Sequence, residues 1–351
     1  MHALQWDTFL GRAPLVLARS QAMSALEGKR ILITGAGGSI GSALTKALLE
    51  FAPRQLVLLE AAELSLYEID AALSPDLDFV PVLGSVTQPA LLREIFTRYR
   101  PQIVYHAAAY KHVPLMEQNP FAAIENNALG TNVLVEAARA GGAEQFILLS
   151  TDKAADPVSM MGASKRIAEL IVLAAGGKAV RLGNVLGSEG SIVPLFLRQI
   201  AFGVPVTVTH PLVRRYFLTM TDAVTLLLHA ACAGPGVLVP DLGEPIAVES
   251  LARYLIKAMA SANAIAFTQL RPGDKMCEAL LSTEESYSEN GGLLRPVKSP
   301  SLPATVLEEV VLQLRQACQD RSRERLLQAV LRAVPQYQPG ELIRSSIEQT
   351  A

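Results

Sequence analysis

Short apolar runs alternate with longer helical segments over the first half of the chain, and this alternation limits the possible folds more than any other feature. The runs predicted to be strands are 30–34, 55–59, 78–83, 102–106, 145–150 and 179–181. The segments with helical periodicity are 40–51, 64–73, 89–99, 119–140 and 162–174. Such alternation is typical of βαβ units and of a parallel sheet that helices cover on both faces. The sequence therefore predicts an α/β fold with a doubly wound parallel Rossmann sheet.

The second half has a looser pattern, which predicts a smaller mixed α/β region that binds the substrate. The elements expected there are helices at 192–201, 222–233 and 248–260, an extended piece at 206–209 and a strand at 237–242. Residues 286–303 are rich in Ser, Pro, Gly and Asn, which predicts a long loop. Two further helices are expected at 305–319 and 321–333.

The charge balance argues against one broad class of function. The chain has 31 Lys and Arg against 33 Asp and Glu, which gives a net charge of −2 and a pI near 6.3. Proteins that bind nucleic acid carry a basic stripe or patch, so we expect no nucleic-acid partner. Half of the 351 residues are hydrophobic and 18% are charged, which excludes an intrinsically disordered chain.

The three cysteines, Cys232, Cys277 and Cys318, are odd in number, far apart and outside any CxxC pair. This pattern argues against a disulfide framework and a zinc site, so we expect three small buried hydrophobic side chains and no metal. The N-terminus lacks a basic region followed by an apolar one, and no stretch has the roughly 20 apolar residues of a membrane span. We therefore expect a cytoplasmic protein without a transmembrane segment.

A glycine-rich turn follows the first predicted strand. Gly35, Gly38 and Gly41 are spaced GxxGxxG, and Ser39 and Ile40 lie at the start of the next helix. Glycines in these positions permit a tight turn, a close approach of the backbone to a pyrophosphate and close packing of helix on strand. Because the motif follows a strand and opens a helix, where unpaired N–H groups favour an anion, it predicts a dinucleotide site.

Two further segments are expected at this site. Glu60 ends the second predicted strand, nineteen residues after Gly41. A carboxylate there can accept hydrogen bonds from an adenosine ribose and would repel a 2′-phosphate, which favours NAD over NADP. Ala107 and Ala108 follow the fourth predicted strand, which flanks the crevice where the strand order should reverse. Their small side chains would allow the cofactor to lie close to the backbone.

Several longer motifs resemble a known enzyme family. They are HAAAYKHVPLMEQNP (106–120), NNALGT (126–131), STDKAADP (150–157), RLGNVLGSEGSIVPLF (181–196), RRYFLT (214–219) and LRPGDKMCEALL (270–281). Together with the glycine motif they resemble the extended short-chain dehydrogenase/reductase superfamily and, more narrowly, the bacterial polysaccharide-biosynthesis nucleotide-sugar 4,6-dehydratases. The resemblance covers nearly the whole chain. Many members carry transmembrane helices ahead of the catalytic part, and this chain resembles that part without them.

The resemblance implies a redox-neutral dehydration by a lyase of the hydro-lyase class. A hydride passes from C4 of a UDP-linked hexose to NAD, water leaves from C5 and C6, and the same hydride returns to C6. The expected substrate is UDP-N-acetylglucosamine and the product its 4-keto-6-deoxy derivative, for surface polysaccharide or glycan biosynthesis. Such a cycle needs a base at the C4 hydroxyl, a base at C5, an acid at the C6 hydroxyl and a tightly held cofactor.

The resemblance also assigns catalytic roles. Thr151 would hydrogen-bond the C4 hydroxyl, Asp152 would be the acid at C6, and Lys153 would be the base at C5. Lys165 would hold the nicotinamide ribose and add positive potential, which together with a dry pocket would depress the pKa of Lys153. Met161 stands four residues before Lys165, where most of the superfamily has a catalytic Tyr.

A thioether cannot transfer a proton, so the base at C4 stays open. Tyr110 is a candidate that we rank below Lys153. One branch of the dehydratases has the same Met, so the change does not by itself imply an inactive enzyme. Asn127 is expected to support the fourth strand through hydrogen bonds to its backbone.

The nucleotide-sugar contacts expected from the matched motifs come from side chains outside the glycine motif. They are Lys111, His112, Asn184, Arg198, Thr209, Arg215, Arg271 and Glu278, the last fixing a ribose or an Arg. Three departures from the family pattern bear on cofactor affinity and on the preferred sugar: Ser85 for Asp, Glu189 for Arg and Arg214 for Thr.

These expectations divide the chain into an N-terminal arm (1–28), an NAD-binding Rossmann domain (29–190) and a nucleotide-sugar-binding region (191–351). The last is expected to interleave with the final Rossmann elements and to include the C-terminal helices. A homo-oligomer is expected through pairing of the helices at 119–140 and 162–174. Two alternatives stay open: a UDP-hexose 4-epimerase, which normally needs the Tyr, and a non-catalytic protein that binds NAD or a nucleotide sugar.

Overall fold

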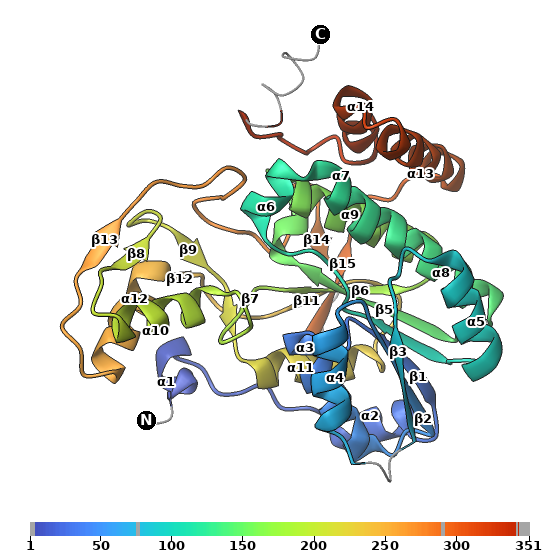
Figure 1. The fold of residues 1–351 in the computed structure, drawn as a ribbon, viewed down its shortest axis with the longest axis horizontal. Helices are drawn as coiled ribbons and strands as arrows, with labels where there is room; N and C mark the ends of the chain where they lie inside the picture. Colours follow the sequence, from blue (N-terminus) through green and yellow to red (C-terminus); the bar gives the residue numbers. More distant parts are fainter. Residues whose placement is uncertain (1–3, 75–77, 289–291, 342, 344–351) are drawn as a thin grey trace.

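A nine-stranded sheet forms the centre of the computed structural model, which describes residues 4–74, 78–288, 292–341 and 343 (Figure 1). Its strand order is β14-β15-β11-β6-β5-β4-β1-β2-β3. All neighbours are parallel except β15, which is antiparallel to both β11 and β14. The strands in chain order are β1 (Arg30–Thr34), β2 (Gln55–Glu60), β3 (Phe79–Leu83), β4 (Ile103–His106), β5 (Gln145–Thr151), β6 (Lys178–Leu182), β11 (Gly236–Pro240), β14 (Ser286–Tyr287) and β15 (Leu294–Lys298). The doubly wound parallel sheet predicted from the sequence is confirmed.

Helices cover both faces of this sheet, as the apolar runs require. In β1, Ile31 and Ile33 belong to one apolar cluster and Leu32 to the other, because successive side chains point to opposite faces. One face carries α2 (Arg19–Leu26), α3 (Ser39–Leu48), α4 (Glu63–Ala71) and α11 (Met220–Ala230). The other carries α5 (Pro89–Tyr99), α8 (Gly130–Ala140) and α9 (Met160–Ala174).

The helix predicted at 119–140 is divided in the structure. It consists of α7 (Pro120–Ala123), a π-helical segment η2 (Ile124–Leu129) and α8, preceded by α6 (Val113–Gln118). Asn127 lies in η2 and accepts a hydrogen bond from Tyr110 N and donates one to Tyr110 O. π-helical turns often occur at functional sites. Asn127 was expected to bond the backbone of the fourth strand; the structure places its amide instead against Tyr110, four residues after the end of β4.

A smaller mixed region lies at the left of Figure 1. Its elements are α10 (Ile192–Ala201), β8 (Val206–Val208), α12 (Val248–Ala258) and β13 (Ile265–Phe267), with short ladders between β9 (Arg214–Arg215) and β12 (Ile246–Ala247) and between β7 (Asn184–Val185) and β10 (Phe217–Leu218). The N-terminal arm joins this region, because Trp6 and Phe9 of α1 (Trp6–Leu10) pack on Tyr254. Residues 1–3 of the predicted arm lie outside the described residues.

Two sequence expectations about the fold and its buried residues are wrong. The segment 286–303 is not a continuous loop, because β14 and β15 form in it and extend the sheet. Leu294 and Val297 of β15 are buried against the sheet, although the surrounding residues have a loop-like composition. Of the three cysteines, only Cys318 is buried; Cys232 and Cys277 are exposed. Cys232 follows the end of α11, and Cys277 forms an isolated β-bridge with Arg214, so neither lies inside a core helix or a strand of the main sheet.

The C-terminal hairpin packs back on the Rossmann helices. α13 (Ala304–Gln319) and α14 (Arg323–Ala333) share an apolar cluster with η2, α8 and α9, and Figure 1 shows them above α7 and α9. Much of the face on which the homo-oligomer expectation rested is therefore covered by the chain itself. Residues 344–351 lie outside the described part of the chain.

In the described residues, no helix is both long and apolar enough to span a membrane, and no group of three or more His, Cys, Asp or Glu is arranged to hold a metal ion.

Candidate active site

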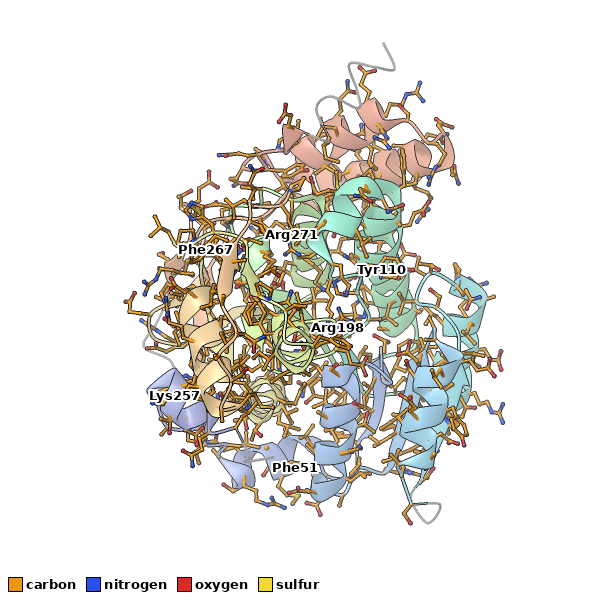
Figure 2. The ribbon with its side chains drawn as sticks, turned by 60° about the vertical axis from the view of Figure 1, so that its left-hand side comes forward. Phe51, Tyr110, Arg198, Lys257, Phe267 and Arg271 are labelled. Carbon is orange, nitrogen blue, oxygen red and sulfur yellow. The ribbon has the colours of Figure 1, made fainter. Side chains whose placement is uncertain are left out.

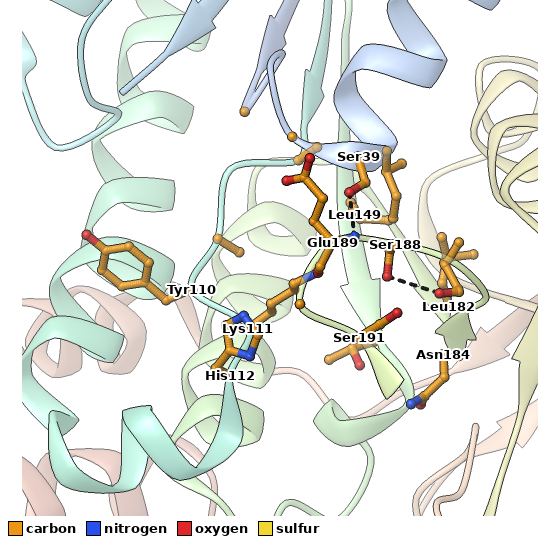
Figure 3. Close-up of a pocket in the computed structure, with 18 of the residues that line it drawn as sticks. Ser39, Tyr110, Lys111, His112, Leu149, Leu182, Asn184, Ser188, Glu189 and Ser191 are labelled. Carbon is orange, nitrogen blue, oxygen red and sulfur yellow. Dashed lines mark hydrogen bonds between the residues drawn. The ribbon is translucent and has the colours of Figure 1, made fainter. Parts of the chain in front are cut away.

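A cavity of about 920 Å³ opens at the carboxyl ends of β1, β4 and β5, where ligands bind in doubly wound sheets (Figure 3). One wall is the glycine turn before α3, and the opposite wall is the segment after β4 that carries Tyr110, Lys111 and His112. The floor comes from the end of β5 and from α9. A loop that follows β7 crosses the mouth. The cavity therefore brings together segments that are far apart in the sequence.

The glycine turn forms a cradle that no larger residue would fit. Gly35 has a φ of +66°, and a Cβ built on it would lie 2.8 Å from Ala108 N. A Cβ on Gly41 would collide with the carbonyl oxygen of Gly35. Lining residues from the predicted cofactor set are Gly35, Gly38, Ser39, Ile40, Gly41, Ala107 and Lys165. The open backbone and the N-terminus of α3 fit a dinucleotide pyrophosphate.

Glu60 lies beside this turn, at the end of β2. Its carboxylate accepts hydrogen bonds from Gly37 N (3.1 Å), Ala61 N (2.8 Å) and Ala62 N (3.0 Å). These bonds hold the carboxylate next to the glycine turn, where the sequence expectation placed it. Glu60 and Ala108 are not among the cavity-lining residues, although Ala62 is.

The end of β5 and the helix α9 carry the predicted catalytic residues. Thr151, Lys153, Met161 and Lys165 line the cavity. Asp152 does not line it, because its side chain is fully buried behind them. Asp152 Oδ1 accepts hydrogen bonds from Thr151 Oγ1 (3.0 Å) and from Lys153 Nζ (2.9 Å). The carboxylate is therefore connected to the cavity through two side chains that line it.

Lys153 is surrounded by acceptors. Besides Asp152, Asn184 Oδ1 lies 3.3 Å from Lys153 Nζ, and Glu278 Oε1 lies 3.8 Å from it. Burial works to lower the pKa of Lys153, but the charges of Asp152 and Glu278 outweigh it and raise that pKa. The expectation of a depressed pKa, with Lys165 as a contributor, is therefore wrong for this state of the protein, because two carboxylates face the ammonium.

The pKa of Lys165 shifts in the opposite direction from that of Lys153. Lys165 is buried, and burial lowers its pKa to about 8, with the charge of Glu169 acting in the opposite direction. A lysine with this pKa still carries a positive charge at neutral pH for most of the time. It can therefore provide the positive potential predicted for it at the floor of the cavity.

Met161 both lines the cavity and belongs to the apolar cluster of α9. Its neighbour Met160 donates its backbone N–H to Glu117 Oε1 at 2.6 Å, which ties the start of α9 to α6. The structure therefore places a thioether where the superfamily pattern has a phenol. Tyr110 also lines the cavity, on the opposite wall, and is half exposed.

The structure places the predicted substrate residues at different distances from the cavity. Lys111, His112 and Asn184 line it (Figure 3). Arg215 and Glu278 are buried behind Lys153, with Arg215 Nε 4.0 Å from Glu278 Oε1. Arg198, Thr209 and Arg271 do not line the cavity. Arg198 is exposed on α10, and Arg271 is exposed and paired with Asp274 at 2.9 Å (Figure 2). Their roles stay predictions.

The sequence analysis did not foresee the contacts of the loop at 187–191. Glu189 N donates to Ser39 Oγ at 3.0 Å, and Lys111 Nζ donates to Glu189 O at 2.6 Å (Figure 3). The loop thus joins the glycine turn to the opposite wall. Among the described residues that line this cavity, Glu189 is the only one with a carboxylate. The sequence already marked this position as unusual, because Glu189 stands where the family pattern has an Arg.

The sequence analysis also missed a buried ionic network beneath the site. Arg181 of β6 donates to Glu169 of α9 at 2.8 Å and to Glu285 at 2.5 Å. Ser150, directly before Thr151, donates to Glu169 Oε1 at 2.6 Å. Arg166 donates to Glu169 Oε2 at 2.9 Å. An Arg at the end of the predicted buried strand 179–181 was the available signal, because such a charge is almost never buried without a partner.

Comparison with known proteins gives a consistent result. A family model described as "Polysaccharide biosynthesis protein" matches residues 31–292. The capsular polysaccharide biosynthesis protein CapD of Staphylococcus aureus is 40% identical over 337 residues, which are 92% of this chain and 56% of that protein. The probable polysaccharide biosynthesis protein EpsC of Bacillus subtilis is 41% identical over 298 residues, 81% of this chain and 50% of that protein. The chain thus spans about half the length of these two relatives.

Other relatives carry the names of nucleotide-sugar enzymes. A UDP-glucose 4-epimerase of Rickettsia rickettsii is 33% identical over 276 residues, 73% of this chain and 79% of that protein. Among solved structures, Pen from Bacillus thuringiensis has a TM-score of 0.71 at 24% identity and covers 84% of this chain and 99% of its own. DesIV, a dTDP-glucose 4,6-dehydratase from Streptomyces venezuelae with NAD and TYD bound, has a TM-score of 0.64 at 19% identity, with coverages of 83% and 98%. These structures share the fold.

Proposed function

This chain belongs to the polysaccharide biosynthesis protein family, and from that premise we propose that it dehydrates a UDP-hexose with NAD, UDP-N-acetylglucosamine being the substrate to test first. The product would be the UDP-4-keto-6-deoxy sugar. The observation that carries the proposal is the hydrogen-bonded Thr151–Asp152–Lys153 segment at the floor of a cavity that also contains the glycine turn. The names of CapD and EpsC support a role in polysaccharide biosynthesis.

The glycine turn, the N-terminus of α3, Glu60 and Lys165 would hold NAD, which when bound supplies the acceptor and donor of hydride. Lys165 would bind the nicotinamide ribose from the cavity floor. Gly35 and Gly41 would keep the pyrophosphate close to the backbone. The loop at 187–191 spans the mouth and would limit the access of water to the site.

The proton transfers would fall to the three consecutive residues at the end of β5. Thr151 would hydrogen-bond the C4 hydroxyl, and Lys153, as the neutral amine, would take the proton from C5. Asp152 would supply the proton for the departing C6 hydroxyl. Because its carboxyl group is buried and bonded to Thr151 Oγ1, the proton would reach the cavity through that hydroxyl.

The direct experiment is to incubate the purified protein with NAD and UDP-N-acetylglucosamine and to follow the nucleotide sugar by mass spectrometry. Dehydration removes the mass of one water molecule from the sugar. The matched control is Lys153→Ala, which should leave the substrate mass unchanged. A product of unchanged mass but altered configuration at C4 would contradict dehydration.

A second candidate is a UDP-hexose 4-epimerase, which the identity to the Rickettsia epimerase favours. Epimerisation shares the oxidation at C4 but does not require an acid at C6 or a base at C5. The Asp152–Lys153 pair would then have no chemical task, and Met161 would leave the oxidation without its usual phenol. The same mass measurement, combined with chromatography of the intact nucleotide sugar, separates the two activities.

A further inference from the structure

Three cations, of which Lys153 is one, meet two carboxylates behind the floor of the cavity. Besides the contact with Asp152 at 2.9 Å, Lys153 Nζ lies 3.8 Å from Glu278 Oε1. Lys275 Nζ lies 3.8 Å from the other oxygen of Glu278, and Arg215 Nε lies 4.0 Å from Oε1. The side chain of Glu278 is 2% exposed. This carboxylate therefore interacts with Lys153 in surroundings where charges are weakly screened.

The cluster is incompletely satisfied when every group is ionised. Asp152 Oδ2 and Glu278 Oε2 are both buried without a hydrogen-bond partner among the described residues. A buried carboxylate oxygen without a hydrogen bond is costly, and protonation of the carboxyl group reduces this cost. Consistently, burial raises the pKa of Glu278 above its ordinary value, although the charge of Lys153 opposes the shift.

The geometry creates a conflict with the proposed reaction. A base at C5 must be a neutral amine, whereas Asp152 and Glu278 together hold Lys153 as an ammonium. We propose that Glu278 is a positioning residue that sets the protonation state of Lys153: the ionised carboxylate holds the ammonium, and the protonated carboxyl releases the amine. The chemical importance of this amine rests on the proposed function.

The proton balance is closed. A proton moves from Lys153 Nζ to a carboxylate oxygen of Glu278, which leaves an uncharged amine and an uncharged carboxyl. The amine then takes the proton from C5 of the sugar and becomes an ammonium. After hydride has returned to C6, the ammonium gives the proton back to C5. Glu278 keeps its proton throughout. The proton of the C4 hydroxyl passes through Thr151 Oγ1 to Asp152, and Asp152 gives it to the departing C6 hydroxyl, which leaves as water.

Glu278 suits this role better than its neighbours. Asp152 Oδ1 accepts a hydrogen bond from Thr151 Oγ1, and Thr151 lines the cavity, so Asp152 is connected to the substrate side. Asn184 Oδ1 faces Lys153 from β7 but does not titrate. Arg215 and Lys275 face Glu278 and oppose its protonation, whereas its burial favours it. The charge of Asp156 works to raise the pKa of Lys275, and the charge of Asp152 works to raise the pKa of Tyr216.

The test is the pKa of Lys153, measured without turnover. Competitive acetylation with acetic anhydride over a range of pH, read by mass spectrometry of the peptide that contains Lys153, reports the fraction of neutral amine. Glu278→Gln removes the carboxylate with little change of shape. We expect the apparent pKa of Lys153 to fall by about one unit, so that its reactivity at a fixed pH below that pKa rises about tenfold. Glu94→Gln, on the exposed side of α5, is the matched control and should give no shift.

The pH profile of dehydration gives the second readout. The acidic limb of the rate should move to lower pH in Glu278→Gln, because the amine forms at lower pH. If Glu278→Gln does not fold, Glu278→Asp retains the charge at a greater distance and should give a smaller shift in the same direction. An unchanged pKa of Lys153 in either folded variant would overturn the inference. A shifted pKa in a protein that never dehydrates the sugar would instead refute the proposed function and leave the assignment of Glu278 intact.

Discussion

Lys153 Nζ donates a hydrogen bond of 2.9 Å to the fully buried carboxylate of Asp152, the residue directly before it in the chain. Two adjacent residues seldom face each other in a strand, where successive side chains point to opposite sides. Here β5 has ended, and the one-turn 3₁₀ helix at Asp152–Ala154 turns both side chains to the same side. The end of the strand thus creates the acid and base pair on which the proposed chemistry depends.

Lys153→Ala should abolish dehydration while NAD stays bound. Removal of a general base typically costs about 100- to 10,000-fold in rate. The glycine turn is untouched by the change, so the affinity for NAD, measured by titration calorimetry, should be close to that of the unchanged protein. Lys257→Ala, at an exposed position on α12, is the control for loss of a lysine. Near-normal turnover of Lys153→Ala would show that the C5 base lies elsewhere.

Met161→Ala should retain substantial activity, because a thioether transfers no proton. The side chain is buried in the α9 cluster, so its truncation should still lower the free energy of unfolding by about 2–5 kcal/mol. The two effects are measured separately, by initial rates at a temperature well below the melting point and by denaturant unfolding. A folded Met161→Ala protein without activity would mean that the sulfur has a direct task.

Gly41→Ala should weaken NAD binding and destabilise the Rossmann domain. The added Cβ would collide with the carbonyl oxygen of Gly35, so the turn and α3 must move apart. Gly234→Ala is the matched control, since a Cβ there meets nothing within 4 Å and the backbone has no positive φ. Titration with NAD and thermal unfolding of both variants provide the comparison. Equal NAD affinities of the two would contradict the packing assigned to Gly41.

Glu169→Gln should reduce the dependence of stability on pH in acid. Burial works to raise the pKa of Glu169, but the charge and hydrogen bonds of Arg181 lower it to about 2, below its ordinary value of 4.5. A carboxyl whose pKa is lower in the folded state stabilises the fold above the unfolded pKa, and this contribution is lost as the pH falls from 4.5 towards 2. Denaturant unfolding at several pH values between 6 and 2 measures the slope of the free energy of unfolding against pH.

The variant should also be less stable at pH 6, because it leaves Arg166 and Arg181 with one fewer buried counter-charge. Glu285 shares the network and keeps part of the slope. A slope equal to that of the unchanged protein would mean that Glu169 does not titrate as described.

Leu314→Ala should destabilise the protein, whereas Leu312→Ala should not. Both leucines lie on α13, but Leu314 is fully buried in the cluster shared with α9 and Leu312 is 63% exposed. We expect a loss of about 2–5 kcal/mol in the free energy of unfolding for the first and less than about 0.5 kcal/mol for the second. Equal effects would show that the C-terminal hairpin is not packed on the Rossmann helices.

Much of the local structure follows from nearest-neighbour patterns. The runs at 30–34 and 55–59 form strands because they are short, apolar and bounded by turn residues. The turn at 35–41 forms a cradle because a Cβ at Gly35 or Gly41 would collide with neighbouring backbone. The helix at 192–201 has the predicted bounds. These features depend on side chains within a few residues of one another, so one sequence contains all the information that they require.

The chain by itself determined the alternation of strands and helices, the dinucleotide cradle and the adjacency of Thr151, Asp152 and Lys153. Only the tertiary structure decided that Glu278 faces Lys153 and raises its pKa, that β15 adds to the sheet beside β11, and that α13 covers the face of α9. These three outcomes join residues more than fifty positions apart. Their free energies come from desolvation, charge and packing across that distance, and periodicity and spacing report none of these quantities.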